Sequence, residues 1–304
     1  MNLPVLAINL VLAILMAPIL DGLRRKVTAR LQNRIGPPIT QTWYDILKLL
    51  RKETILPEMG GFLVLVFPVL TLMLSLAMFA TISTVTVQSP IDKGAVIFIE
   101  LAVLSAFVLA IAGSTSRNPY AIVGGSREVV LATLVEPSII LSLTALILFK
   151  GSTTFDDISR SYSVGIPLLV AIVAYFLSLL GESGRIPFDV AEAESELSGG
   201  PLIEFSGLPL AFVKLSQNVR SLALYSIPKF FIAAFIPLGV VGESYSVTIV
   251  ILYFASLLLC TLVISLAESL NARYRLMEAS RFYGIVLGLS SIALILSFLT
   301  HGAG

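Results

Sequence analysis

FLVLVFPVLTLMLSLAMFATISTVTV, residues 62–87, contains no charged side chain over its whole length. About 20 mostly apolar residues are enough for a helix to cross roughly 30 Å of hydrocarbon. The composition of the whole chain agrees, with 57% hydrophobic residues, 13% charged residues and a mean hydropathy of +0.96. Soluble domains carry about 25% charged residues. The sequence therefore predicts an integral membrane protein.

Seven further apolar stretches accompany this one, and together they predict an all-α integral membrane protein with eight transmembrane helices. Lipid offers the backbone no hydrogen-bond partners, so each stretch should be helical. Pro228 implies a kink that neighbouring groups must repair, and Lys229 beside it should snorkel or form a pair. The first stretch lacks a cleavage pattern and runs directly into basic residues, which predicts a retained helix. The expected spans are residues 3–20, 62–87, 95–112, 129–149, 164–180, 222–241, 247–267 and 282–299.

The distribution of positive charge predicts the orientation. We expect a single transmembrane domain, residues 1–304, with long loops at 21–61, 113–128, 181–221 and 268–281. These loops hold sixteen of the twenty lysines and arginines. Basic loops stay on the cytoplasmic side of a membrane. We therefore expect a multi-pass protein of the cell (plasma) membrane with both termini outside.

The first of these loops contains an amphipathic segment, ITQTWYDILKLLRK, residues 39–52. Its apolar residues recur with a helical period and its charged residues lie between them. The segment is too short to cross the membrane. It predicts a transverse helix lying in the interface plane, although the pattern also fits an ordinary connector.

The third loop is the most acidic part of the chain. Residues 181–207 read GESGRIPFDVAEAESELSGGPLIEFSG, in which Arg185 is the single base among six acids. A carboxylate beside or inside a bilayer is costly to keep ionised, so a cluster of them points to a function. The expected function is the handling of protons or other cations, and a solvated acidic face is the simpler alternative. The acids are Glu182, Asp189, Glu192, Glu194, Glu196 and Glu204.

The chain carries few residues that could hold a redox centre. Cys260 is the single cysteine and His301 the single histidine. These numbers exclude a disulfide framework and a cysteine-held iron–sulfur cluster within this chain, and they argue against a histidine metal site. Glycine-rich nucleotide motifs are also missing, and the near-neutral net charge of +1 argues against nucleic acid. Any redox chemistry must come from a partner.

Three separated motifs resemble the NuoH-like family, whose members form subunit 1 of complex I, the membrane subunit of NADH:quinone oxidoreductase nearest the quinone. The first is RKVTARLQNRIGP at residues 25–37, followed by the DxxKL pattern at Asp45. The second places Tyr120, Gly124, Arg127 and Glu136 at the spacing of that family. The strongest is the acidic loop, which fits the pattern ExxRxPFDxxExExELxxGxxxExSG from Glu182 to Gly207.

Other residues depart from the quinone-reducing members. Arg24 stands where that branch usually carries an acid, and the connection after Pro37 is compressed. The segment ESLNARYRL, residues 268–276, is more similar to hydrogenase-linked relatives. These are formate hydrogenlyase subunit 4, energy-converting hydrogenases, and archaeal membrane-bound hydrogenase or sulfane-sulfur reductase complexes. We place the chain in that branch.

The resemblance implies a membrane anchor that couples electron transfer in a cytoplasmic arm to proton or sodium movement. A carboxylate kept from water favours its protonated form and can exchange a proton near neutral pH. The expected relay comprises Glu136, Glu182, Glu100, Asp189, Glu192 and Glu196, leading toward antiporter-like membrane subunits. Structural pairing of Glu136 and Glu182 with Arg127 or Arg185 is the alternative.

The basic first loop has two possible partners. It can hold anionic lipid head groups, each contact contributing about 1 kcal/mol, or it can dock the arm. The resemblance implies a hydrogenase-like large subunit and iron–sulfur subunits in that arm, which would carry the nickel–iron centre and the iron–sulfur clusters. The expected docking residues are Arg25, Lys26, Arg30, Arg34, Gly36, Pro37 and Glu204.

Two other functions stay open at this point. A quinone-binding subunit of an NADH:quinone oxidoreductase would need a lipophilic tunnel open to the bilayer between the first span and the amphipathic helix, and quinone would then be a ligand. A stand-alone secondary transporter should show an inverted repeat with paired broken helices. We see no such repeat in the sequence.

Overall fold

The computed structural model describes residues 3–56, 61–82, 91–115, 118–192, 194–236 and 245–301, and within these the regular structure is entirely helical. This confirms the all-α membrane fold. The helices are α1 Leu3–Leu31, α2 Gln41–Arg51, α3 Gly61–Ala80, α4 Gly94–Ser114, α5 Pro119–Lys150, α6 Phe155–Arg160, α7 Ile166–Glu182, α8 Glu194–Leu197, the 3₁₀ helix η1 Gly200–Glu204, α9 Gly207–Ser226, α10 Pro228–Ala233, α11 Tyr245–Leu270 and α12 Leu276–His301.

Six of the described helices are long and apolar enough to cross a membrane, namely α1, α3, α4, α5, α11 and α12. The predicted fifth span corresponds to α7, a shorter apolar helix of 17 residues. The predicted sixth span is divided between the end of α9 and α10, and its last residues, 237–241, lie outside the described residues, as do residues 83–87 of the second. The count of eight therefore stays a prediction.

Several helices extend into segments expected as loops. Helix α1 continues to Leu31, α5 begins at Pro119 and α9 begins at Gly207. Residues 21–31, 119–128 and 207–221 are thus helical. Hydropathy misses these extensions because they carry polar side chains, which lower the local mean hydropathy. Arg220, expected in a loop, is one of them.

The break between α9 and α10 follows from Pro228. Proline has no backbone N–H, so the carbonyl of Leu224, four residues earlier, loses its usual helical partner. The hydroxyl of Tyr175 donates to that carbonyl at 2.8 Å, and the Ile227 N–H approaches it at 3.1 Å. The neighbouring helix α7 thus repairs the kink, as expected for a proline in lipid.

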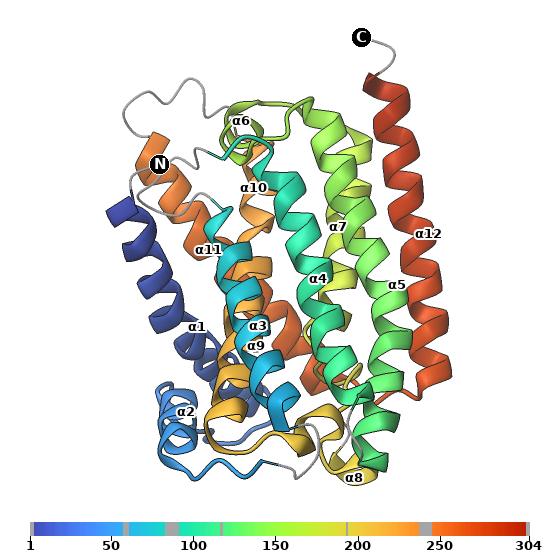
Figure 1. The fold of residues 1–304 in the computed structure, drawn as a ribbon. Helices are drawn as coiled ribbons and strands as arrows, with labels where there is room; N and C mark the ends of the chain where they lie inside the picture. Colours follow the sequence, from blue (N-terminus) through green and yellow to red (C-terminus); the bar gives the residue numbers. More distant parts are fainter. Residues whose placement is uncertain are drawn as a thin grey trace.

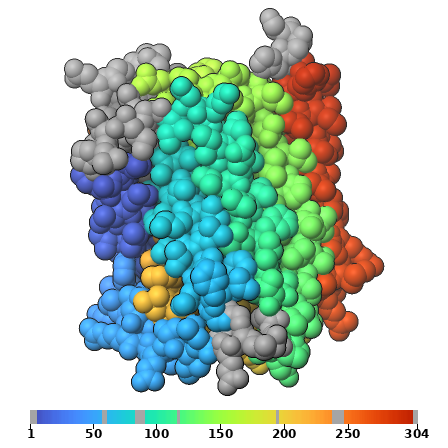
Figure 2. Space-filling view, in the orientation of Figure 1, coloured from blue at the N-terminus to red at the C-terminus, as the bar shows by residue number. Residues whose placement is uncertain are grey.

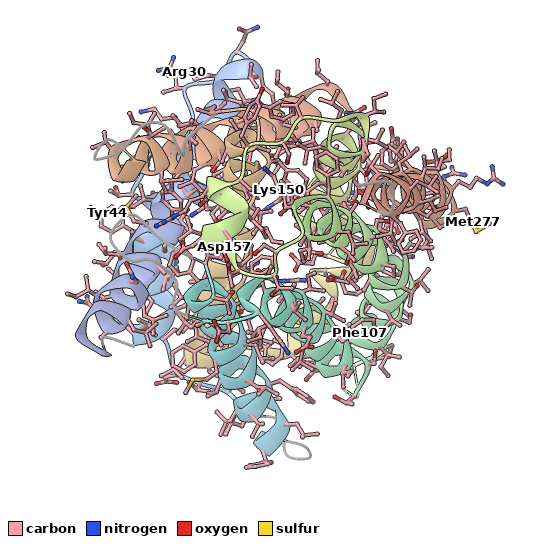
Figure 3. All side chains as sticks on the ribbon, turned by 90° about the horizontal axis from the view of Figure 1, so that it is seen from above. Arg30, Tyr44, Phe107, Lys150, Asp157 and Met277 are labelled. Atoms are coloured by element: carbon pink, nitrogen blue, oxygen red, sulfur yellow. The ribbon has the colours of Figure 1, made fainter. Side chains whose placement is uncertain are left out.

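The helices stand side by side, and α5 packs on α4, α7 and α12 (Figure 1). Helix α1 begins and α12 ends at the upper end, whereas α2 and α8 lie at the lower end. The short helix α6 lies across the upper end, and the view from above (Figure 3) shows Lys150 and Asp157 near the centre of the molecule. We call the end with α2 and α8 the lower end.

The outer surface of the bundle is apolar, as a lipid-facing surface requires. Helix α12 forms one edge of the molecule in the space-filling view (Figure 2). On this helix Ile285 is 75% exposed and Phe298 is 69% exposed. Helix α2 confirms the predicted amphipathic helix, because Ile46 is buried against the bundle while Leu47 and Leu50 are exposed.

Candidate functional site

Two glutamates and one arginine meet inside the bundle. Glu136 of α5 has 1% of its surface exposed, and the side chain of Glu182, the last residue of α7, is 5% exposed. Arg220 of α9 places Nη2 2.7 Å from Glu136 Oε1 and 2.5 Å from Glu182 Oε1. The same nitrogen donates to the Ala102 carbonyl of α4 at 3.0 Å. One guanidinium therefore binds four helices together.

This triad of Glu136, Glu182 and Arg220 carries one more negative charge than positive charge when both acids are ionised. It also leaves two buried polar atoms without hydrogen bonds to the described residues, namely Glu136 Oε2 and Arg220 Nε. Such atoms are costly unless water or a proton satisfies them. The arrangement favours a site that takes up and releases a single positive charge.

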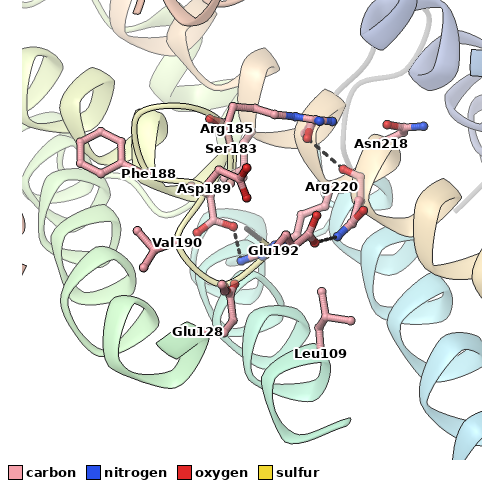
Figure 4. A pocket seen from close by; sticks show the side chains of 16 residues that line it. Leu109, Glu128, Ser183, Arg185, Phe188, Asp189, Val190, Glu192, Asn218 and Arg220 are labelled. Carbon is pink, nitrogen blue, oxygen red and sulfur yellow. Dashed lines mark hydrogen bonds and ion pairs between the residues drawn. The ribbon is translucent and has the colours of Figure 1, made fainter. Parts of the chain in front are cut away.

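A polar cavity of about 80 Å³ adjoins the triad (Figure 4). It is lined by Glu182 and Arg220 together with Glu128, Asp189 and Glu192. A buried water needs about 10–15 Å³ of such volume, so the cavity has room for several water molecules. Four acids and two arginines, Arg185 and Arg220, therefore surround one space large enough for several water molecules.

The turn at residues 186–189 is held by the connection between α11 and α12. Arg273 Nη2 lies 2.7 Å from Asp189 Oδ2, and the Tyr274 N–H donates to the Pro187 carbonyl at 2.9 Å. Burial raises the pKa of Asp189 above its usual range, and Glu192 adds to this effect, while the Arg273 guanidinium opposes it. Phe188 anchors the turn, with its ring centroid 4.7 Å from that of Tyr283.

The acidic loop is tied to two more helices. Gln217 of α9 donates to Glu192 at 2.9 Å, with Lys214 3.9 Å away. Arg127 of α5 pairs with Glu196 at 2.8 Å, and this contact lowers the pKa of the exposed Glu196. The loop is thus fixed on both sides of the cavity mouth.

A second charged cluster lies between α1, α11 and the turn. Arg24 is 3% exposed and pairs with Asp21 at 2.9 Å and with Glu268 of α11. Arg185 pairs with Asp21 at 3.3 Å, and Thr42 of α2 donates to the same carboxylate at 3.0 Å. A cavity of about 10 Å³ beside this cluster shares Ser183, Arg185, Asn218 and Ser221 with the larger cavity.

Comparison with known proteins identifies the family of this chain. A family model described as NADH dehydrogenase matches residues 3–299. The chain belongs to the NADH dehydrogenase family. Hydrogenase-4 component C of Escherichia coli K12 is 33% identical over 298 residues, which cover 93% of this chain and 92% of that protein. Formate hydrogenlyase subunit 4 of the same organism is 32% identical over 290 residues, covering 92% and 93%.

The matches extend to a subunit of complex I and to a solved structure. NADH-ubiquinone oxidoreductase chain 1 of Arabidopsis thaliana is 32% identical over 227 residues, covering 70% of this chain and 70% of that protein. A solved chain of the membrane-bound sulfane sulfur reductase, an archaeal respiratory membrane complex, has the same fold, with a TM-score of 0.78 at 23% identity and coverage of 96% and 98%. The resemblance to subunit 1 of complex I and to its hydrogenase-linked relatives is confirmed.

The structure of this family member brings some of the predicted relay residues together. Glu136 and Glu182 share Arg220, and Asp189 and Glu192 line the adjoining cavity. Glu196 lies at the exposed end of the loop, and Glu100 is exposed on α4. The side chain of Glu194 lies outside the described residues.

The expected charge partners form other pairs. Arg127 pairs with Glu196 rather than Glu136, and Arg185 pairs with Asp21 rather than Glu182. Sequence reasoning missed Arg220 and Glu128 because both fall in segments taken as loops. A signal was present in α9, where polar residues recur with a helical period at Lys214, Gln217, Asn218 and Ser221.

Lys229 does not snorkel. Its side chain is 1% exposed, and its ammonium lies 4.7 Å from the Phe230 ring centroid and 5.1 Å from that of Tyr253. It is therefore not exposed on the surface of the bundle, and cation–π contacts stabilise it inside.

The predicted docking residues gather at the lower end. Arg25 pairs with Asp45 of α2 at 3.0 Å, while Arg30 and Arg34 are exposed. Gly36 has φ +73°, and a Cβ there would lie 2.7 Å from the Cβ of Ala29, so the turn that ends α1 requires glycine. Lys26, Pro37 and Glu204 are partly exposed. Among the described residues, no group of three or more His, Cys, Asp or Glu side chains is arranged to hold a metal ion.

Proposed function

We propose that this chain is the ion-translocating membrane anchor of a multi-subunit redox complex of the hydrogenase or sulfur-reductase type. The observation that carries the proposal is the buried pair Glu136 and Glu182 on the single cation Arg220, beside an acidic cavity with room for several water molecules. The chain would couple electron transfer in a cytoplasmic arm to the movement of protons or sodium ions.

The charge balance of the triad explains how it would move an ion. Removing one partner from a buried ion pair typically costs about 3–5 kcal/mol, so Arg220 strongly favours one ionised glutamate. The second glutamate then has no cation of its own and is the one that exchanges. The proton can alternate between Glu136 and Glu182. The acids that line the cavity, Glu128, Asp189 and Glu192, would then pass the charge through the cavity toward the acidic loop.

The lower end is the proposed docking surface for the arm. Arg30 and Arg34 are exposed there, and neither they nor Lys26 pairs with an acid among the described residues. The relatives named hydrogenase-4 component C and formate hydrogenlyase subunit 4 support an arm with a hydrogenase-like large subunit and iron–sulfur subunits, which would carry the nickel–iron and iron–sulfur centres. Antiporter-like membrane subunits would take up the ion path.

We also propose that the chain acts as one transmembrane domain of the cell membrane, with the lower end in the cytoplasm and both termini outside. The basic residues of α1 and α2 support this orientation through the positive-inside rule. Glu100, exposed on a transmembrane helix, would face a neighbouring membrane subunit rather than lipid, because lipid cannot hydrate a carboxylate.

The junction of α1 with α2 supports this function over quinone binding. A Cβ at Gly22 would lie 1.8 Å from the Ile39 carbonyl oxygen, so the two segments are in direct contact. Behind them Asp21, Arg24 and Thr42 form a hydrogen-bonded cluster, and the cavity there has about 10 Å³, enough for one water molecule. A lipophilic tunnel would need a wide apolar opening at this place.

Replacing Glu136 with Gln in the assembled complex tests the proposal. E136Q keeps the size of the side chain and removes its charge. We expect ion movement to fall by about 100-fold, the usual weight of one proton-transfer group, while arm turnover with an artificial electron donor or acceptor is retained. The control is E278Q, since Glu278 is exposed at the start of α12 and Gln retains its capping hydrogen bond. Unchanged ion movement in E136Q would overturn the relay.

A further inference from the structure

Tyr283 of α12 is a buried polar side chain outside the triad and its cavity. Its exposed fraction is 0%, and its hydroxyl has no hydrogen-bond partner among the described residues. Buried tyrosine hydroxyls usually find a partner, because an unsatisfied one costs free energy. We therefore expect a polar group or a bound molecule to lie within hydrogen-bond distance of the Tyr283 hydroxyl.

The hydroxyl lies at the junction of α5, α7 and α12. A Cβ added to Gly181 would come within 2.3 Å of Tyr283 Oη and 2.9 Å of Val135 Cγ2. Gly181 immediately precedes Glu182, and Val135 immediately precedes Glu136. The tyrosine hydroxyl thus packs on α7 at the residue before Glu182, with the Val135 side chain of α5 nearby, and only glycine at position 181 gives it room.

Aromatic packing fixes the direction of the ring. The Tyr283 ring centroid lies 4.7 Å from Phe188 and 5.2 Å from Phe282, and Phe188 lies 5.4 Å from Tyr274. Phe188 belongs to the turn that carries Asp189, and Tyr274 belongs to the connection between α11 and α12. The ring cannot swing away to find solvent, so its hydroxyl must be satisfied where it is.

We propose that Tyr283 is a positioning residue whose hydroxyl binds Glu182 through a buried water molecule. Glu136 Oε2 is an acceptor without a hydrogen bond, and Glu182 Oε1, which pairs with Arg220 Nη2, can accept one more; Tyr283 Oη and Arg220 Nε are donors without acceptors among the described residues. A buried water needs two to four polar partners, and this region supplies them. The inference rests on the proposed function, because it assigns a partner to a residue of the relay.

The charged surroundings of Glu182 define what this contact would change. Glu136 and Glu128 of α5 and Arg220 of α9 lie near the Glu182 carboxyl group, as does Tyr175 of α7. Asp189 and Arg185 line the same cavity as Glu182. Tyr283 is the ionisable residue of α12 in these surroundings. A hydrogen-bond donor favours the ionised form of a carboxyl group. Loss of the Tyr283 hydroxyl would make Glu182 hold its proton to higher pH.

The test is the pH profile of ion movement in the assembled complex carrying Y283F, which removes one oxygen and leaves the ring. We expect the rising limb of the profile to move upward by about one pH unit, a tenfold change in proton affinity, with arm turnover retained. Incorporation of 3-fluorotyrosine at position 283 strengthens the donor and should move the limb downward. Y274F, which removes a hydroxyl from the same aromatic cluster, should leave the profile in place.

An unshifted profile in Y283F, a shift to lower pH, or an equal shift in Y274F would overturn the inference. If Y283F does not assemble, the fluorotyrosine variant decides alone, since it preserves the packing, and an unshifted profile there overturns the inference. The proposed function fails separately, through unchanged ion movement in E136Q, and the role of Tyr283 would then fail with it. Lost ion movement in E136Q with an unshifted profile in Y283F would remove only Tyr283.

Discussion

At the scale of single residues, Arg220 is the side chain on which the site depends. It is the only cation that the described structure places on either Glu136 or Glu182. The Arg220 guanidinium holds the two carboxylates so close together that the protonation state of each depends on that of the other. Glu136 and Glu182 can therefore share a single proton.

Replacing Arg220 with Gln should destabilise the protein by about 3–5 kcal/mol, because both glutamates lose their counter-ion inside the bundle. Combining R220Q with E136Q removes one of the unpaired charges, so the double variant should recover part of the loss. The measurement is thermal unfolding of the purified complex for the wild type, the two single variants and the double variant. Strictly additive losses would show that the two residues do not interact.

Asp189 gives a pH dependence whose sign follows from its raised pKa. The folded protein then holds a proton that the unfolded chain has already released, in the pH range above about 3.9, the value for unfolded aspartate. Stability falls as pH rises through this range and levels off above the raised pKa. D189N, which does not titrate, should lack this fall when unfolding temperatures are compared across pH. An equal slope in both proteins would contradict the assignment.

At the scale of elements, the broken helix made by α9 and α10 sets the position of Arg220. Pro228 interrupts the helix, and Tyr175 of α7 binds the carbonyl that the proline leaves free. The break is therefore compensated by the same helix that carries Glu182. This link keeps α7 and α9 in register, and it places Arg220 opposite the end of α7.

Y175F should destabilise the protein by about 1 kcal/mol, the usual contribution of one hydrogen bond. P228A supplies the missing backbone N–H to the Leu224 carbonyl. The Tyr175 substitution should therefore cost less in a P228A background than in the wild type. Thermal unfolding of the four proteins measures the difference. The same cost in both backgrounds would show that the hydroxyl does not compensate for the proline.

At the scale of the whole molecule, the two ends of the bundle differ in charge and in content. The lower end collects the basic residues of α1 and α2, the acidic loop and both cavities, whereas the upper end carries α6 and the ends of α1 and α12 (Figure 1). Segments distant in sequence, such as Asp21 and Glu268, meet on Arg24. The site thus exists only in the assembled bundle.

Cysteine labelling in intact cells tests the orientation. Cys260, the one native cysteine, is buried and should stay unlabelled. Cysteines introduced at Tyr162, exposed near the upper end, and at Ser126, exposed near the lower end, report on the two faces. An impermeant maleimide should label Y162C from outside and S126C only after permeabilisation. The reverse pattern would place the lower end outside.

The all-α membrane fold, the family and most of the acids of the site were predictable from the amino-acid sequence. These rest on local properties, namely apolar length and motif spacing, which each segment carries alone. The pairing of charges depends on the tertiary structure, because the ion pair of Arg220 with Glu136 joins two residues that are 84 positions apart in the sequence. Hydropathy placed Arg220 in a loop since it averages over neighbours, whereas burial of a charge depends on the opposite charge that a distant helix supplies.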